Sequence, residues 1–100
     1  MNPLADVDDE FARYFRSLGY VVTWDFNRTE RWYEILDGKR MLCQVDIGVP
    51  IAHFLEDMAL FAQGIRKGTS ASIYTANGEP EDFKAIYERT LRTPPPALDT

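Results

Sequence analysis

Few side chains in this 100-residue chain are of the types that do chemistry, and they are spread along it. The single histidine, His53, stands four positions before Asp57. On a helix this spacing places the two side chains one turn apart, so that a carboxylate could orient an imidazole for general acid–base catalysis. No nucleophile stands near them, and an exposed ion pair on a helix explains the same spacing. We therefore predict no catalytic residue.

Cys43 is the only cysteine, and its place in an alternating apolar run predicts the core face of a strand. A buried thiol of this kind is inert. One cysteine and one histidine cannot form a Cys/His zinc site, so we predict neither a metal nor a cofactor. The lone cysteine, the lack of a signal-peptide pattern and the absence of a membrane-spanning apolar run together predict a cytoplasmic protein without membrane contact.

Glu34 and Asp46 lie on neighbouring predicted strands, and this arrangement loosely resembles restriction-type nucleases. Those enzymes hold Mg²⁺ with an acid followed by an acid-x-Lys tripeptide on the next strand. The corresponding tripeptide here, Gln44-Val45-Asp46, contains no lysine. The two carboxylates are also expected on opposite faces, so a metal-dependent nuclease is not predicted.

The order of elements resembles that of double-stranded RNA-binding domains, but the resemblance is limited to topology. The second helix would begin at Pro50 and carry Glu56 and Asp57 where phosphate binding needs basic residues. With 11 basic and 16 acidic residues, the net charge is −5. Nucleic-acid binding through hairpin arginines (Arg28, Arg31 and Arg40) is therefore the least favoured alternative.

The apolar periodicity predicts an α+β fold in the order α-β-β-β-α-β-α. A three-stranded antiparallel meander would be packed by helices, and a short fourth strand could join its edge. The expected helices are 6–18, capped by Asp6, 50–67 and 80–92, and the expected strands are 20–26, 31–36, 39–47 and 71–75. Residues 1–93 form one predicted domain, and 94–100 a loose proline-rich tail.

The hairpin around Asp37-Gly38 organises this prediction, since this dipeptide favours a two-residue turn. A three-residue loop at 27–29 would place Trp24 opposite Trp32. The predicted core face of the hairpin then carries Trp32, Leu36, Met41, Cys43, Val45 and Ile47, with Glu34 as its only acid. The opposite face combines apolar anchors with arginines, as interfaces do, and is the predicted partner-binding patch: Arg31, Tyr33, Ile35, Arg40 and Leu42. The last helix, or a second copy in a homodimer, could cover this face instead.

These features predict a small acidic protein–protein interaction module. It would act as an inhibitor or modulator of a partner, as immunity proteins, antitoxins and phage-encoded regulators do, and the partner could present a basic surface. The alternative is a small enzyme or ligand-binding domain with a pocket between sheet and helices, using His53 with Asp57, or Glu34.

Overall fold

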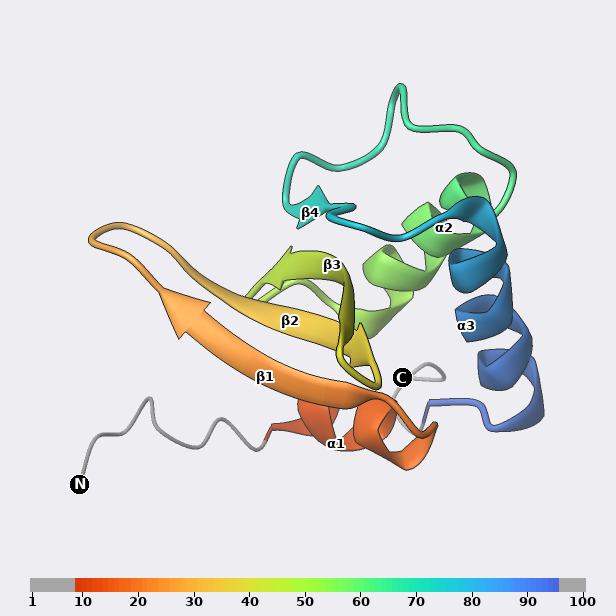
Figure 1. Cartoon of the computed structure of the whole chain (residues 1–100), viewed down its shortest axis with the longest axis horizontal. Coiled ribbons are helices and arrows are strands. Elements are labelled where there is room, and N and C mark those ends of the chain that lie inside the picture. The colour runs from red at the N-terminus through yellow and green to blue at the C-terminus, as the bar shows by residue number, and fades with distance from the viewer. Residues whose placement is uncertain (1–8, 96–100) are drawn as a thin grey trace.

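The computed structural model describes residues 9–95, and within this range the chain forms three helices and four strands in the order α-β-β-β-α-β-α (Figure 1). The predicted α+β fold is confirmed. The cap predicted at Asp6, and residues 96–100 of the predicted tail, lie outside this range. The elements are α1 (Glu10–Ser17), β1 (Val21–Phe26), β2 (Arg31–Asp37), β3 (Arg40–Asp46), α2 (Ile51–Phe61), β4 (Ile73–Tyr74) and α3 (Pro80–Arg92).

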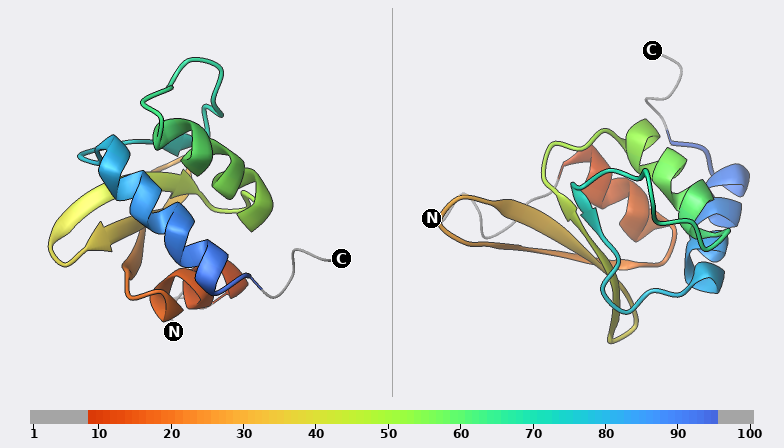
Figure 2. Two further views of the ribbon diagram at one scale, coloured as in Figure 1. Left: turned by 90° about the vertical axis from the view of Figure 1, so that its right-hand side faces the viewer. Right: turned by 90° about the horizontal axis from the view of Figure 1, so that it is seen from above.

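The sheet is antiparallel and its strands follow one another in chain order, β1-β2-β3-β4. The short β4 pairs with the outer edge of β3, as predicted for a fourth strand. All three helices lie on one side of the sheet (Figure 2), so one sheet face is covered and the other is open. These two faces are called the covered face and the open face below.

An aromatic cluster joins the helices to the covered face. The ring of Tyr33 on β2 stacks on Phe11 of α1, with centroids 4.7 Å apart, and Phe54 of α2 meets Phe11 edge-on at 5.4 Å. The Tyr33 hydroxyl donates a hydrogen bond to the carboxylate of Asp9. The same carboxylate caps α1, because its Oδ1 accepts from the backbone N–H of Ala12 at 3.0 Å. The polar end of a buried ring is thus satisfied by the start of a helix.

Helix α2 is shorter than the periodicity predicts, ending at Phe61 and not near residue 67. The reason is Gly64, which takes the left-handed conformation with φ +79°. The backbone N–H of Ile65 then bonds to the carbonyl of Leu60 at 3.0 Å and closes the helix end. The chain leaves α2 through a long loop, residues 62–72, which leads to β4.

Candidate functional site

The apolar part of the predicted partner-binding patch lies in the core. Tyr33 is 1% exposed, Ile35 0% and Leu42 1%. The prediction that these side chains form an exposed surface is therefore wrong. Strand β2 faces the opposite way from the prediction, with Tyr33 and Ile35 towards the helices and Trp32 and Glu34 on the open face.

The first cause is the loop between β1 and β2. Residues 27–30 connect the paired residues Phe26 and Arg31, so the loop has an even number of residues and not the predicted three. Asn27 builds it, since its Oδ1 accepts from the backbone N–H of Thr29 at 2.9 Å and of Glu30 at 2.8 Å. One added residue reverses the relative facing of two strands, and Trp24 consequently pairs with Tyr33.

The second cause is a bulge in β3. Leu36 pairs with Met41 but Ile35 pairs with Cys43, so Leu42 is the additional residue. The turn lies at Gly38-Lys39, one residue later than predicted, with φ +63° at Gly38. The loop reverses the facing of β2 relative to β1, and the bulge reverses the facing of β3 relative to β2. Beyond the bulge, β3 therefore faces the same way relative to β1 as predicted. Cys43 and Val45 on β3 are therefore buried as predicted. The error is confined to β2 and to residues 40–42 at the start of β3, where Met41, predicted in the core, pairs with Leu36 on the open face.

The two arginines of the predicted patch are exposed but have different surroundings. Arg40 donates to both carboxylate oxygens of Asp82 on α3, with Nη1 3.0 Å from Oδ2, and to the carbonyl of Asn77. This hydrogen bonding lowers the pKa of the Asp82 carboxyl and raises that of the Arg40 guanidinium. Arg31 lies at the far end of β2 beside the loop. Arg40 thus holds the hairpin to a helix of its own chain.

The open face consists of three rows of cross-strand neighbours, with the β3 bulge between the first row and the second. Paired residues in antiparallel strands share a face, so the register fixes its rows. The rows are Val21–Leu36–Met41, Thr23–Glu34–Gln44–Tyr74 and Asp25–Trp32–Asp46. The rows combine exposed apolar side chains, such as Val21 (44%) and Tyr74 (66%), with three carboxylates, and no position in them is basic.

Trp32 is the central aromatic side chain of this face. Its Nε1–H donates to Oε2 of Glu34 at 3.3 Å, and Glu34 also accepts from the Thr23 hydroxyl at 3.3 Å. The indole N–H is therefore satisfied within the sheet, and the partly exposed ring is held in one orientation. Glu34, predicted as the one acid of the core, instead fixes an aromatic side chain on the open face.

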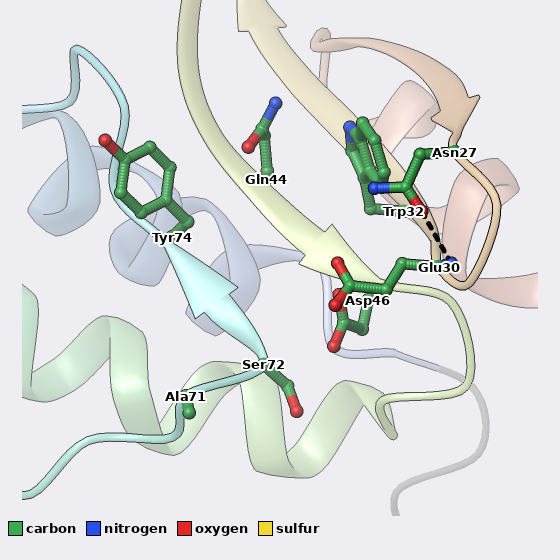
Figure 3. Close-up of a pocket in the computed structure, with 8 residues that line it drawn as sticks. All are labelled: Asn27, Glu30, Trp32, Gln44, Asp46, Ala71, Ser72 and Tyr74. Atoms are coloured by element: carbon green, nitrogen blue, oxygen red, sulfur yellow. Dashed lines mark hydrogen bonds between the residues drawn. The ribbon is translucent and has the colours of Figure 1, made fainter.

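A cavity of about 370 Å³ lies on this face, over β3 and between β2 and β4 (Figure 3). Trp32 and Tyr74 stand on opposite sides of Gln44, and the carboxylates of Glu30 and Asp46 lie together near one end. Its lining is completed by Asn27, Ala71 and Ser72. Sequence reasoning missed this site, because it depends on the loop and bulge that turn Trp32 outwards. The available signal was Asn27, a residue that favours longer side-chain-capped turns.

The other candidates do not form a reactive site. His53 is exposed, whereas Asp57 is 5% exposed and its Oδ2 accepts from the backbone N–H of Ser70 at 2.9 Å. Burial raises the pKa of the Cys43 thiol to about 12, so the thiol stays protonated. Within residues 9–95, no group of three or more His, Cys, Asp or Glu side chains could hold a metal ion.

Strand β1 forms one edge of the sheet, where a partner strand could pair. The guanidinium of Arg16 on α1 donates to the carbonyl of Val22 at 2.8 Å. One hydrogen-bonding position of this edge is thereby occupied by the chain itself. A strand added at β1 would have to displace this hydrogen bond.

No helix in the described part of the chain is long and apolar enough to cross a membrane. Comparisons of the chain with protein-family models, with characterised proteins and with solved structures found no match. The functional argument therefore rests on the geometry and chemistry of the open face.

Proposed function

We propose that this protein is a small acidic interaction module that binds a protein partner through the open face of its sheet and modulates that partner. The face replaces the predicted patch of Tyr33, Ile35 and Leu42 as the docking surface. Occlusion of the partner's own working surface would be the mode of action, as for an inhibitor or an immunity-type protein. A cytoplasmic location is part of this proposal.

The observation that carries the proposal is the outward-facing Trp32 in a sheet face without a helical cover. Tryptophan and tyrosine are enriched at the energetic centres of interfaces, where they supply large apolar area with a polar handle. Trp32 is held in place by Glu34, and Leu36 and Met41 extend the apolar surface along the sheet. A preorganised aromatic side chain loses little conformational freedom on binding.

The charge of the face supports a partner with a basic surface. Asp25, Glu34 and Asp46 are its only charged strand residues, and Glu30 adds a fourth carboxylate from the adjacent loop. Complementary charge speeds association and suppresses wrong partners. A nucleic acid also stacks on exposed aromatic side chains of a sheet, but its phosphates would be repelled by these carboxylates. Arg40, one of the arginines considered for that use, is engaged with Asp82.

Affinity capture from the native host, followed by mass spectrometry and calorimetry with the purified partner, tests the proposal. The variant Trp32→Ser/Met41→Gln removes apolar area from the open face, and we expect it to weaken the partner's binding by about 100-fold, as loss of an interface hot spot does. A matched control, Tyr87→Ser/Leu91→Gln, changes exposed apolar residues of α3 and should leave binding unchanged.

Both variants should retain the wild-type circular dichroism spectrum and a cooperative unfolding transition, with the midpoint lowered by no more than about 10 °C, because all four side chains are partly or largely exposed. Loss of binding in the α3 variant with retention in the open-face variant would contradict the assignment. Capture of the same partner at equal affinity by both variants would also refute it.

A further inference from the structure

We infer that the cavity between Trp32 and Tyr74 receives an arginine side chain from the protein partner. The inference rests on the proposed function and identifies which group of the partner the open face recognises. Three observations carry it: the aromatic walls of the cavity, its carboxylates and the loop that positions one of them.

The aromatic walls are suited to a flat cation. Trp32 stands on β2 and Tyr74 on β4, with Gln44 of β3 between them (Figure 3). Trp32 pairs with Asp46 and Tyr74 pairs with Gln44, so the two rings stand in neighbouring rows, diagonally across β3, on strands roughly 10 Å apart. A planar cation that enters the cavity over Gln44 can therefore lie against the Trp32 ring, with Tyr74 at the other side of the cavity. Guanidinium stacks on aromatic rings by cation–π attraction and by surface contact, which an ammonium group does less well.

The charge of the cavity selects a cation. Glu30 and Asp46 are the charged residues of its lining, and no hydrogen bond or ion pair to either carboxylate is found among residues 9–95. Arg31 lies in the neighbouring depression with Glu30 and Asp46 but does not line this cavity. The acceptor capacity of the two carboxylates is therefore available to a donor that enters from outside. A guanidinium provides paired N–H donors in the geometry that carboxylates accept.

The loop at residues 27–30, which determines that Trp32 lies on the open face, also positions this site. Asn27 Oδ1 accepts the backbone N–H of Glu30 at 2.8 Å, and the backbone N–H of Asn27 bonds back to the Glu30 carbonyl at 2.9 Å. On the opposite side, the backbone N–H of Asp46 bonds to the Ser72 carbonyl at 2.9 Å and ties β3 to the β4 segment. Both carboxylates thus project from backbone that is already fixed, and the site is preorganised for a ligand.

Titration of ¹⁵N-labelled protein with capped tripeptides tests the inference. The probes are acetyl-Gly-Arg-Gly-amide, its lysine analogue and its uncharged citrulline analogue, and the reporters are the two indole N–H signals of Trp24 and Trp32. We expect the arginine peptide to shift the Trp32 signal saturably and to leave the Trp24 signal, on the covered face, in place. Citrulline should bind about tenfold more weakly, since charge-assisted hydrogen bonds are roughly twice as strong as neutral ones.

In the variant Glu30→Gln/Asp46→Asn, the affinity for the arginine peptide should be lower by about tenfold or more. The control Glu56→Gln/Glu88→Gln removes the same charge from exposed positions of α2 and α3, and should change binding less than about twofold in 150 mM salt. Equal affinity for arginine and citrulline, or unchanged binding in the Glu30/Asp46 variant, would overturn the inference. Tighter binding of spermidine than of the arginine peptide would do the same.

The two proposals fail in different ways. If partner binding is lost in the Trp32→Ser/Met41→Gln variant but the arginine peptide does not bind, the open face is the interface and the arginine assignment is wrong. If the peptide binds at Trp32 while partner capture is insensitive to open-face variants, the cavity recognises guanidinium and the proposed interface is wrong.

Discussion

Trp32 and Tyr33 are neighbours on one strand, and they show how differently the two faces of the sheet use an aromatic side chain. Tyr33 is 1% exposed, stacks on Phe11 and sends its hydroxyl to Asp9 at the start of α1. Trp32 is partly exposed, and its N–H is satisfied by Glu34, two residues along the same strand. The polar group on the covered face is bonded across 24 residues of sequence, and the one on the open face is bonded locally.

This difference indicates which of the two aromatic side chains stabilises the fold and which is available for binding. A side chain bonded across the fold holds elements together, so Tyr33 connects β2 to the cap of α1. A side chain whose polar group is satisfied by its own strand makes no tertiary connection and leaves its ring available. The open face can therefore change its outward residues with little effect on the core, while the covered face cannot.

Thiol reactivity should show the largest difference between the two faces. Cys43 and Gln44 are adjacent, yet Cys43 is 0% exposed and Gln44 lines the open cavity. We expect a thiol introduced by Gln44→Cys, in a Cys43→Ala background, to react with Ellman's reagent at least ~1000-fold faster than native Cys43, since Cys43 must await unfolding. The wild type in 8 M urea is the control for full reactivity. Comparable rates in the native state would show that the covered face is open.

The free energy of unfolding should also depend on pH through the Cys43 thiol. The folded chain holds the Cys43 proton more tightly than the unfolded chain, because burial raises the thiol pKa to about 12. The ordinary value is about 8.5, so this contribution to stability is complete below about pH 8.5 and is lost as the pH rises towards the folded value. The reaction of Cys43 should accelerate over this range as unfolding becomes easier.

The elements of the fold could be predicted from the sequence, but the facing of β2 could not. Apolar spacing located α3 and the fourth strand, and alternation placed Cys43 and Val45 correctly. Strand β2 reads Arg-Trp-Tyr-Glu-Ile-Leu, with large apolar residues on both faces, so alternation alone does not decide which face is buried. Which face of β2 is buried depends on the loop at 27–30 and on the bulge in β3. Each contains one residue more than the predicted hairpins assume. The candidate site was missed for this reason.

Truncation of the two aromatic side chains should give the next largest difference. We expect Tyr33→Ala to lower the free energy of unfolding by about 3–5 kcal/mol, because it leaves a cavity in the aromatic cluster. Trp32→Ala should cost about 1 kcal/mol, as the ring is partly exposed. Urea unfolding followed by circular dichroism measures both. If Tyr33→Ala does not fold, Tyr33→Phe, which removes only the hydrogen bond to Asp9, should still cost about 1 kcal/mol. A larger loss for Trp32→Ala than for Tyr33→Ala would reverse the assignment of the faces.

The smallest change in the free energy of unfolding should come from loss of the Arg40–Asp82 ion pair, which links the hairpin to α3. Asp82 accepts from Arg40 and from the backbone N–H of Glu79 at 2.8 Å, and the hydrogen bond from Arg40 is the main reason that its pKa is lowered. A lowered carboxyl pKa stabilises the fold above the ordinary value of about 3.9, and this contribution is lost as the pH falls through the lower, folded value.

Because the Arg40 side chain is 46% exposed and its charge is therefore screened by solvent, Asp82→Asn should cost no more than about 1 kcal/mol at pH 7, although the Asp82 side chain itself is 16% exposed. The difference from wild type should disappear when urea unfolding is repeated below the folded pKa of this carboxyl. Glu81→Gln, an exposed acid in the same helical turn, is the matched control and should have a smaller effect. A difference between wild type and Asp82→Asn that persists at low pH would mean that the side chain acts through packing and not through its charge. Neither variant should alter partner binding, because both residues lie on α3, away from the open face.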